Sequence, residues 1–309
     1  MINKKIFIGG CDRSGTTLLA SMLASSPRIA TTPESQFKLN LLKLSNRRLP
    51  ESETKKVLSR LFNDFRFKIW LEKPDFLETF KYKIKPGLSS KEILEEMVSS
   101  YCGEEPYCWI DHTPNNIQNV SFLKNVFPES SFIHIVRDGR AVAASVKPLP
   151  WGPNTTYHAA TWWAYRVSFG CAAELAWPDK VYRVSYESLV NNPEDTLLSL
   201  CENLDIQYDS RMLSGSGFKL PSYTKKQHCH VGKSVKSTQV NLWKKRLSDR
   251  DIEIFEAKVG GLLSSFGYEL LHDKRQLPKI SERVKIHANE LFYALINFAR
   301  HRIRLRKLP

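Results

Sequence analysis

Short apolar runs alternate along this chain with longer segments in which apolar residues recur at helical spacing. The runs are rich in β-branched and aromatic side chains and lie at Lys4–Gly9, Arg28–Thr31, Tyr107–Ile110, Phe132–Val136 and Val181–Ser185. Runs that are apolar throughout are typical of parallel strands buried on both faces. The pattern therefore predicts an α/β fold of three layers, in which helices cover a central, mainly parallel five-stranded sheet.

The longest helical segment follows the second predicted strand. Residues 37–105 carry Leu, Phe, Lys and Glu at helical spacings, with breaks near Pro50, Pro74 and Pro86. Open α/β sheets bind ligands beside the ends of their strands, and this segment leaves the sheet at such an end. It is therefore expected to form a helical insertion on the side of the second substrate.

A second long helix is expected later in the chain, from roughly Thr155 to Trp177. This helix fits the spacing of four residues, namely Tyr157, Thr161, Tyr165 and Phe169. The stretch Pro148–Pro153 before it is rich in proline and must form a loop.

The C-terminal segment, residues 276–309, differs in character from the domain of residues 1–275 and predicts a basic amphipathic helix. It contains Lys279, Arg283, Lys285, Arg300, Arg302, Arg304, Arg306 and Lys307 against only Glu282 and Glu290. One interpretation is a solvated helix that packs on the domain through Leu291, Leu295 and Phe298. The alternative is a peripheral contact with a membrane surface or another polyanion.

Composition narrows the class of protein without naming a partner. With 309 residues, of which 42% are hydrophobic and 11% aromatic, the chain can bury a large core, and disorder of the whole chain is excluded. The formal net charge of +14 favours anionic partners. Nucleic acid, a membrane surface and an anionic ligand are attracted alike, so charge alone does not choose among them.

The sequence offers no sign of a membrane span or a metal site. No stretch reaches the roughly 18 to 20 apolar residues of a spanning helix, and only Met1 to Lys5 precede the apolar core of the first strand. A signal peptide would not fit there, so a cytoplasmic protein is expected. The six cysteines include no C-x-x-C pair, and His228-Cys229-His230 has no further ligand at a familiar spacing.

A glycine-rich loop joins the first strand to a helix. The strand runs into the sequence Gly9-Gly10-Cys11-Asp12-Arg13-Ser14-Gly15-Thr16-Thr17, which a helical pattern follows. Backbone N–H groups at such a helix start bind anions, which predicts a P-loop-like fold. The pattern G-x-x-x-x-G-K-[ST] is met except that Thr16 replaces the lysine. Arg13 supplies a cation within the loop, which suits a leaving phosphate without Mg²⁺.

A second anion site is expected at the end of the fourth strand. Arg137 follows that strand directly, and Ser145 lies two turns along the next helix. A guanidinium and a hydroxyl at this spacing can close on one phosphate group. A nucleoside with phosphates at both ends would need both pockets.

These motifs together resemble those of sulfotransferases that use 3′-phosphoadenosine 5′-phosphosulfate. The loop Gly9–Thr17 resembles the family's 5′-phosphosulfate loop, and Val136–Arg140 with Ser145 resembles its 3′-phosphate motif. The likeness runs from residue 4 to about residue 270 and is greatest to the branch of tyrosylprotein sulfotransferases and their bacterial relatives. It extends to Tyr182–Leu189, to Lys236-Ser237-Thr238, and to Trp243 followed by Leu247.

The resemblance implies roles for residues on the donor side. Arg13 and the amides of Ser14, Gly15, Thr16 and Thr17 would hold the 5′-phosphosulfate, with Arg13 also assisting transfer. Arg137 and Ser145 would hold the 3′-phosphate, and Tyr186, Ser237 and Thr238 would complete the nucleotide pocket. No metal is expected.

On the acceptor side, the resemblance implies that Glu34 is the general base. His112, in Asp111-His112-Thr113-Pro114, stands where the family usually carries a lysine that assists the leaving group. It could act as a cation if protonated or form a hydrogen bond to a nonbridging oxygen if neutral, and a structural role is the alternative. Gln36 and Asn40 replace arginines with which tyrosylprotein enzymes grip acidic peptides, which disfavours such peptides.

Two other functions compete with sulfuryl transfer to an acceptor hydroxyl. A P-loop kinase or NTPase would use Mg-ATP, with Asp111 as the carboxylate near magnesium. A non-catalytic basic protein would dock on nucleic acid or membrane through its charged tail. We expect no nucleic-acid partner, and the acceptor hydroxyl could belong to a glycan, a lipid, a small molecule or a peptide.

Overall fold

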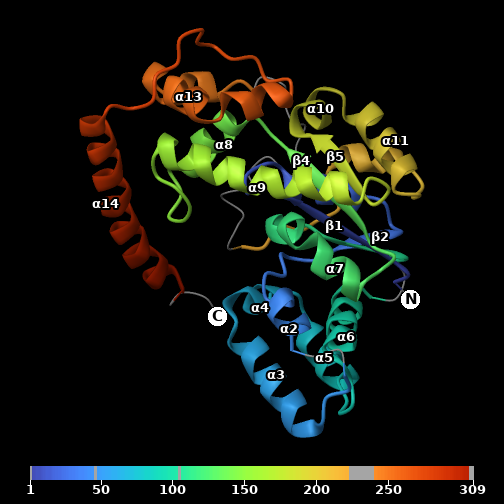
Figure 1. Cartoon of the computed structure of the whole chain (residues 1–309). Helices are drawn as coiled ribbons and strands as arrows, with labels where there is room; N and C mark the ends of the chain where they lie inside the picture. The colour runs from blue at the N-terminus through green and yellow to red at the C-terminus, as the bar shows by residue number, and fades with distance from the viewer. Residues whose placement is uncertain (1, 45–46, 104–105, 223–239, 306–309) are drawn as a thin grey trace.

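The computed structural model describes residues 2–44, 47–103, 106–222 and 240–305 and contains one five-stranded parallel sheet. The strands β1, β2, β3, β4 and β5 lie in the order β2-β3-β1-β4-β5 (Figure 1) and span Lys4–Gly10, Ile29–Thr31, Cys108–Asp111, Ser131–Val136 and Val181–Ser185. Every pair in the sheet is parallel. The five predicted strands and the α/β class are confirmed.

Alternate residues of the sheet face two separate cores, because side chains alternate between faces along a strand. Phe7 and Trp109 face one core, where their rings meet edge to face at 5.8 Å. Ile6 and Ile110 face the other, which packs under α1 (Thr16–Leu23), α10 (Tyr186–Asn191) and α11 (Pro193–Asn203). Both faces of the sheet are therefore covered, as the unbroken apolar runs predict.

Residues 37–105 form the helical insertion expected after the second strand. Figure 1 shows it as a group of helices below the sheet. Its breaks coincide with the predicted prolines, since Pro50 caps α3 and the other two lie between helices. The helices are α2 (Lys38–Leu42), α3 (Glu51–Asn63), α4 (Phe65–Trp70), α5 (Phe76–Lys83) and α6 (Ser90–Cys102).

The long helix α9 (Thr156–Ala176) confirms the expected element. Tyr165 and Phe169 are exposed, whereas the buried side includes Trp163 and Gly170. A Cβ on Gly170 would lie 2.1 Å from the ring of His134 in β4. The helix lies this close to the sheet because small residues such as Gly170 face it.

The remaining helices connect the sheet to the C-terminal part of the chain. They are α7 (Val120–Val126), α8 (Gly139–Val146), α12 (Trp243–Arg246), α13 (Asp249–Ser265) and α14 (Ile280–Leu305), with 3₁₀ turns η1 (Pro114–Asn119) and η2 (Ser210–Ser214). The predicted basic helix is thus present as α14. The expectation that it packs through Leu291, Leu295 and Phe298 is wrong, because these side chains are 68%, 72% and 61% exposed.

None of the helices in the described ranges combines the length and the apolar character needed to cross a bilayer.

Candidate active site

The glycine-rich loop turns tightly between β1 and α1. Arg13 and Gly15 have φ angles of 71° and 101°, which lie in the left-handed region. The Ser14 amide donates to the carbonyl of Cys11 at 3.1 Å. A Cβ on Gly15 would lie 2.6 Å from the ring of Tyr186, so only glycine fits at that position. The loop therefore presents its backbone at the start of α1, where N–H groups favour an anion.

The side chains of Asp12 and Ser14 differ in their hydrogen bonding within the loop. Asp12 accepts from Nε of Arg166 on α9 at 2.9 Å, which anchors the loop to the layer of helices. The hydroxyl of Ser14 is fully buried and has no hydrogen-bond partner among the described residues. A buried hydroxyl without a partner is costly unless a ligand supplies one.

The two predicted anion sites adjoin each other in the structure. Nε of Arg13 donates to Oγ of Ser145 on α8 at 3.2 Å. Arg137, at the end of β4, donates from Nη1 to the backbone carbonyl of Arg13 at 3.0 Å. The phosphate loop and the strand-end arginine therefore face one region at the carboxyl edge of the sheet.

Arg137 is oriented by several neighbours. Its guanidinium carbon lies 4.2 Å from the ring centroid of Tyr186, and Nε1 of Trp163 donates to its carbonyl at 3.1 Å. The Nε atom of Arg137 is buried and has no partner in the described part of the chain. Like the Ser14 hydroxyl, it is a buried donor that a bound ligand could satisfy.

The other residues of the strand-end motif hold the backbone in place. Asp138 caps α8 by accepting from the amide of Arg140 at 2.8 Å, and it also pairs with that guanidinium. Arg140 reaches Glu256 on α13 at 2.5 Å, and a Cβ on Gly139 would lie 2.6 Å from Trp163. This buried network fixes where β4 ends, and hence where Arg137 stands. The predicted Ser237 and Thr238 lie outside the described residues.

Glu34 and His112 line one small cavity together with Thr17 of the phosphate loop; its other lining residues are Pro33, Arg66, Ile69, Phe218 and Pro221. The candidate base and the candidate anion loop thus border the same space. Glu34 follows β2, and His112 follows β3. Neighbouring parallel strands bring both to the same edge of the sheet, as their positions in the sequence predict.

Two side chains contact Oε2 of the Glu34 carboxylate. Gln36 donates to it at 3.3 Å, and Nη1 of Arg66 on α4 lies 3.4 Å away. Burial raises the pKa of Glu34 above its ordinary value of 4.5, and the charge of Arg66 opposes that rise. A carboxylate with a raised pKa accepts a proton more readily than an ordinary one.

His112 is neutral near pH 7. Burial lowers its pKa from 6.5 to about 4, although Asp111 opposes the shift. Its Nδ1 lies 3.4 Å from the hydroxyl of Thr31, and that hydroxyl donates to the carbonyl of Ile110 at 3.0 Å. The Thr31 hydroxyl oxygen therefore accepts a hydrogen bond from Nδ1–H of His112. This pairing places the proton of the neutral ring on Nδ1 and its lone pair on Nε2. The cationic alternative for His112 is not supported.

Asp111 is enclosed in a hydrogen-bond network and does not face the cavity as a magnesium carboxylate would. It pairs with the fully buried Lys38 at 3.3 Å and accepts from Ser35, from the Thr113 amide and from Asn116. Burial alone would raise the pKa of Asp111, but Lys38 and these hydrogen bonds outweigh it and lower the pKa to about 2.

Three residues of this region escape sequence reasoning. Arg66 comes from within the insertion, Lys38 lies inside α2, and Asn116 lies in η1. Arg66 contacts Glu34, and Lys38 contacts Asp111, across several intervening elements, while Asn116 joins Lys38 to Asp111. Asn116, for example, accepts from Lys38 at 2.5 Å and donates to Asp111 at 2.9 Å. Spacing along the chain carries no signal for such contacts.

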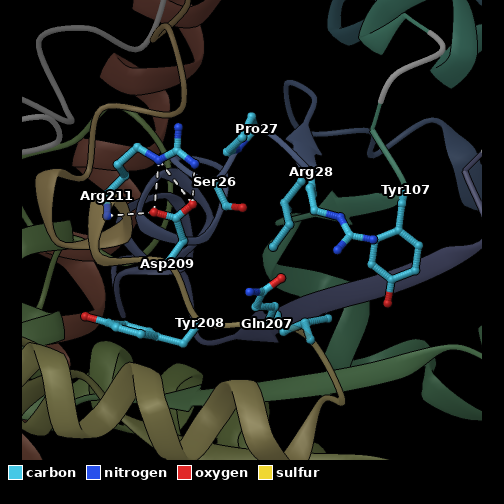
Figure 2. Close-up of a pocket in the computed structure, with 10 residues that line it drawn as sticks. Ser26, Pro27, Arg28, Tyr107, Gln207, Tyr208, Asp209 and Arg211 are labelled. Atoms are coloured by element: carbon cyan, nitrogen blue, oxygen red, sulfur yellow. Dashed lines mark hydrogen bonds and ion pairs between the residues drawn. The ribbon is translucent and has the colours of Figure 1, made fainter.

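A cavity of about 350 Å³ lies apart from this site, at the amino ends of β2 and β3. Figure 2 shows Arg28 beside Tyr107 there, and Arg211 paired with Asp209. None of the predicted site residues lines it. In the described residues, no group of three or more His, Cys, Asp or Glu side chains is arranged to hold a metal ion.

Comparison with known proteins identifies the family. The model of the sulfotransferase family matches residues 5–210, which is more than half of the chain. This chain belongs to the sulfotransferase family. Membership makes it a transferase of sulfuryl groups and confirms the resemblance carried by the two anion motifs.

Relatives and solved structures agree with this membership. The sulfotransferase is 25% identical to protein-tyrosine sulfotransferase 1 of Danio rerio, over 85% of this chain and 72% of that protein. It is 25% identical to protein-tyrosine sulfotransferase A of Caenorhabditis elegans, over 67% of this chain but only 51% of that protein.

Among solved structures, the sulfotransferase domain of the Synechococcus PCC 7002 olefin synthase superposes with a TM-score of 0.60 at 20% identity, covering 86% of this chain and 95% of that domain. The sulfotransferase domain from the curacin biosynthetic pathway superposes with a TM-score of 0.57 at 16% identity, covering 86% and 98%. These likenesses show the sulfotransferase fold, which is P-loop-like.

Proposed function

We propose that this sulfotransferase moves the sulfuryl group of 3′-phosphoadenosine 5′-phosphosulfate to an acceptor hydroxyl, with Glu34 as general base. One observation carries the proposal. Two buried donors, the Ser14 hydroxyl and Nε of Arg137, lack partners among the described residues and stand on adjoining anion pockets. A nucleotide with a phosphate at each end would satisfy both donors at once.

The residues present fit such a donor. The loop amides at the start of α1 and the Arg13 guanidinium would hold the 5′-phosphosulfate. Arg137 and Ser145 would hold the 3′-phosphate, and the Tyr186 ring supports both the loop and Arg137. The donor supplies the sulfuryl group, whose bond to the 5′-phosphate breaks as the bond to the acceptor oxygen forms. Arg13 stabilises the negative charge that develops on the bridging oxygen.

The acceptor side completes the geometry of an in-line transfer. The cavity shared by Glu34, His112 and Thr17 would orient the acceptor hydroxyl against the donor loop. Glu34 takes the hydroxyl proton as the oxygen bonds to sulfur, a task that its raised pKa favours. Neutral His112, with its lone pair at Nε2, would accept a hydrogen bond from the acceptor. It would not stabilise the leaving group as a lysine does.

The alternative of a Mg-ATP enzyme has less support. Asp111, the expected magnesium carboxylate, already pairs with Lys38. Thr16 occupies the position of the P-loop lysine, and its side chain is buried. A kinase would also leave the pocket of Arg137 and Ser145 without a function.

The acceptor is proposed only as a hydroxyl compound. The relatives named above are protein-tyrosine sulfotransferases, which favours a phenolic hydroxyl of a peptide. Gln36 donates to Glu34 here instead of offering a cation to an acidic peptide. The pocket therefore suits an acceptor with less negative charge than an acidic tyrosine peptide.

Calorimetry of the purified chain tests the proposal. We expect adenosine 3′,5′-bisphosphate to bind without Mg²⁺, and the sulfate donor to transfer labelled sulfate to hydroxyl compounds in an acceptor library. Binding of Mg-ATP with no response to the bisphosphate would overturn the proposal and favour the kinase.

A further inference from the structure

The C-terminal helix α14 is attached to the rest of the molecule through polar contacts. Glu282 forms an ion pair with Arg250 on α13 at 2.7 Å, and Glu290 accepts from the amides of Asn154 and Thr155. Asn297 donates to the side chain of Asn154 at 2.8 Å. The space between the helix and the domain is a cavity of about 820 Å³ lined largely by polar residues. Figure 1 shows α14 along one side of the molecule.

The apolar side of α14 faces away from the domain. Four side chains at spacings of one helical face form what we call the outer stripe: Ile280, Val284, Leu291 and Leu295. They are between 62% and 78% exposed. Glu282 and Asn297 lie on the opposite side of the helix, whereas His287, beside the stripe, meets the rings of Tyr157 and His158 on α9. Exposed large apolar residues on one face, before and after His287, indicate a surface for a partner.

The charges of α14 are divided between its sides in the same way. Its two acidic residues, Glu282 and Glu290, both bind groups of the domain. At 100° per residue, helical geometry places Arg283 and Lys285 on the two flanks of the outer stripe, and both are exposed. The surface around the stripe is therefore basic and has no acidic side chain from α14.

We propose that α14 docks on an anionic lipid membrane, with its axis in the plane of the interface. The outer stripe would enter the boundary between headgroups and acyl chains, and the flanking cations would meet the anionic headgroups. This proposal is independent of the sulfuryl donor and of Glu34.

A second copy of this chain fits the stripe less well. Pairing two copies of α14 along their stripes would bring their basic flanks together, and like charges at close range oppose association. An anionic bilayer offers both an apolar layer and negative charge, which complement the stripe and its flanks. Charge complementarity therefore selects the membrane.

Sedimentation of the full chain with vesicles tests the docking surface. We expect binding to vesicles of phosphatidylcholine and phosphatidylserine in equal parts, and much less binding to phosphatidylcholine alone. The double variant Leu291→Asp/Leu295→Asp should lose about tenfold or more of the affinity, because it removes two apolar anchors. The double variant Arg283→Glu/Lys285→Glu should lose about tenfold or more, because each cation near an anionic surface contributes to binding.

Matched variants separate the helix from general effects of surface change. Leu175→Asp alters a leucine on α9 that is 86% exposed, and Lys81→Glu/Lys85→Glu reverses the charge of two exposed lysines of the insertion. Both controls should bind vesicles like the wild type. All variants should keep the thermal unfolding midpoint, because the changed side chains are exposed. They should also keep the affinity for adenosine 3′,5′-bisphosphate, because none of the changed residues lies at the donor site.

Three results would overturn the proposal. Equal binding to both kinds of vesicle would remove the electrostatic part. Unchanged binding of the leucine double variant would indicate adsorption by charge alone, as for any polyanion. A wild-type dimer in solution that this variant converts to a monomer would assign the stripe to a second copy of the chain.

Discussion

Arg137 is oriented before any ligand arrives. The Tyr186 ring lies 4.2 Å from its guanidinium carbon, and Nη1 is held by the carbonyl of Arg13. Such a residue loses little freedom when it binds a phosphate, and its unpartnered Nε gains a hydrogen bond. Arg137 should therefore contribute to the affinity for the nucleotide.

The variant Arg137→Ala tests this at the donor site. We expect the affinity for adenosine 3′,5′-bisphosphate to fall by about 1.5 to 3 kcal/mol, the contribution of a charge-assisted hydrogen bond. Titration calorimetry measures it, with Arg28→Ala as the control, because Arg28 lies beside Tyr107 in the separate cavity. Equal losses in the two variants would contradict the assignment of Arg137 to the donor pocket.

Glu34 should act on the rate and not on donor affinity. In Glu34→Gln, the side chain keeps its size but cannot take a proton. We expect turnover to fall by roughly 10² to 10⁴, while the dissociation constant of the bisphosphate stays nearly unchanged. Steady-state kinetics with saturating donor, together with calorimetry, distinguish the two. A parallel loss of affinity would show that Glu34 holds the donor instead.

Arg66 should set the pH at which Glu34 works. Its charge lowers a pKa that burial has raised, so Arg66→Gln should raise the pKa of Glu34 further. A base must be unprotonated, and the acidic limb of the turnover profile should therefore move to higher pH. Lys68→Gln, on the same helix, is the control and should leave the limb in place. A shift of the limb to lower pH in Arg66→Gln would contradict the role of Glu34.

Sequence motifs identify residues at the ends of strands, because parallel strands bring those ends to one edge of the sheet. The loop and the strand-end motif indicate Arg13, Arg137 and Ser145, and the structure brings these three together. Arg66 and Lys38 could not be predicted, because their partners belong to other elements and depend on how the insertion packs. The role of Ser237 stays a prediction.

At the scale of elements, the strand, loop and helix around Gly15 form the most constrained turn of the site. Gly15 has a φ of 101°, and a Cβ there would meet the Tyr186 ring, whereas Gly87 has a φ of 92°, and a Cβ there would meet nothing within 4 Å. Comparing Gly15 with Gly87 therefore separates the cost of the left-handed backbone from the cost of a side-chain clash.

Replacing each of these two glycines by alanine provides a matched comparison. Both variants should lose about 1 to 2 kcal/mol of unfolding free energy through the left-handed backbone. Gly15→Ala should lose more and should also weaken bisphosphate binding, because its Cβ displaces Tyr186 and the loop. Urea unfolding and calorimetry measure the two effects. Unchanged bisphosphate binding by Gly15→Ala would argue against this loop as the phosphate site.

Elements are predictable from local pattern to different degrees. The five strands follow from apolar runs, and the bounds of β5 agree with the prediction at both ends. The contact face of α9 does not follow, because small residues such as Gly170 make its closest approach to the sheet. The aromatic residues Tyr165 and Phe169 recur at helical spacing but lie on the exposed side of α9.

In the molecule as a whole, a buried ion pair joins the insertion to the sheet. Lys38 on α2 and Asp111 on β3 are both fully buried. Removing one partner leaves a buried charge without compensation, so Lys38→Met should lower the unfolding free energy by about 3 to 5 kcal/mol. Urea unfolding measures the loss, and Lys43→Met, at the exposed end of the same helix, should cost far less. Similar losses in both variants would show that the Lys38–Asp111 pair does not hold the insertion to the sheet.

We infer that the two halves of the donor site bind one ligand together. Arg13 comes from the loop after β1, and Arg137 comes from the end of β4. Parallel pairing of these strands sets the two arginines side by side at one edge. The account requires a single ligand to bridge them.

A crystal structure of the chain with adenosine 3′,5′-bisphosphate tests whether one ligand bridges them. We expect the 5′-phosphate on the amides of Ser14 to Thr17 and the 3′-phosphate on Arg137 and Ser145. A nucleotide bound elsewhere, or one that contacts only one of the two arginines while the other faces a different cavity, would contradict it.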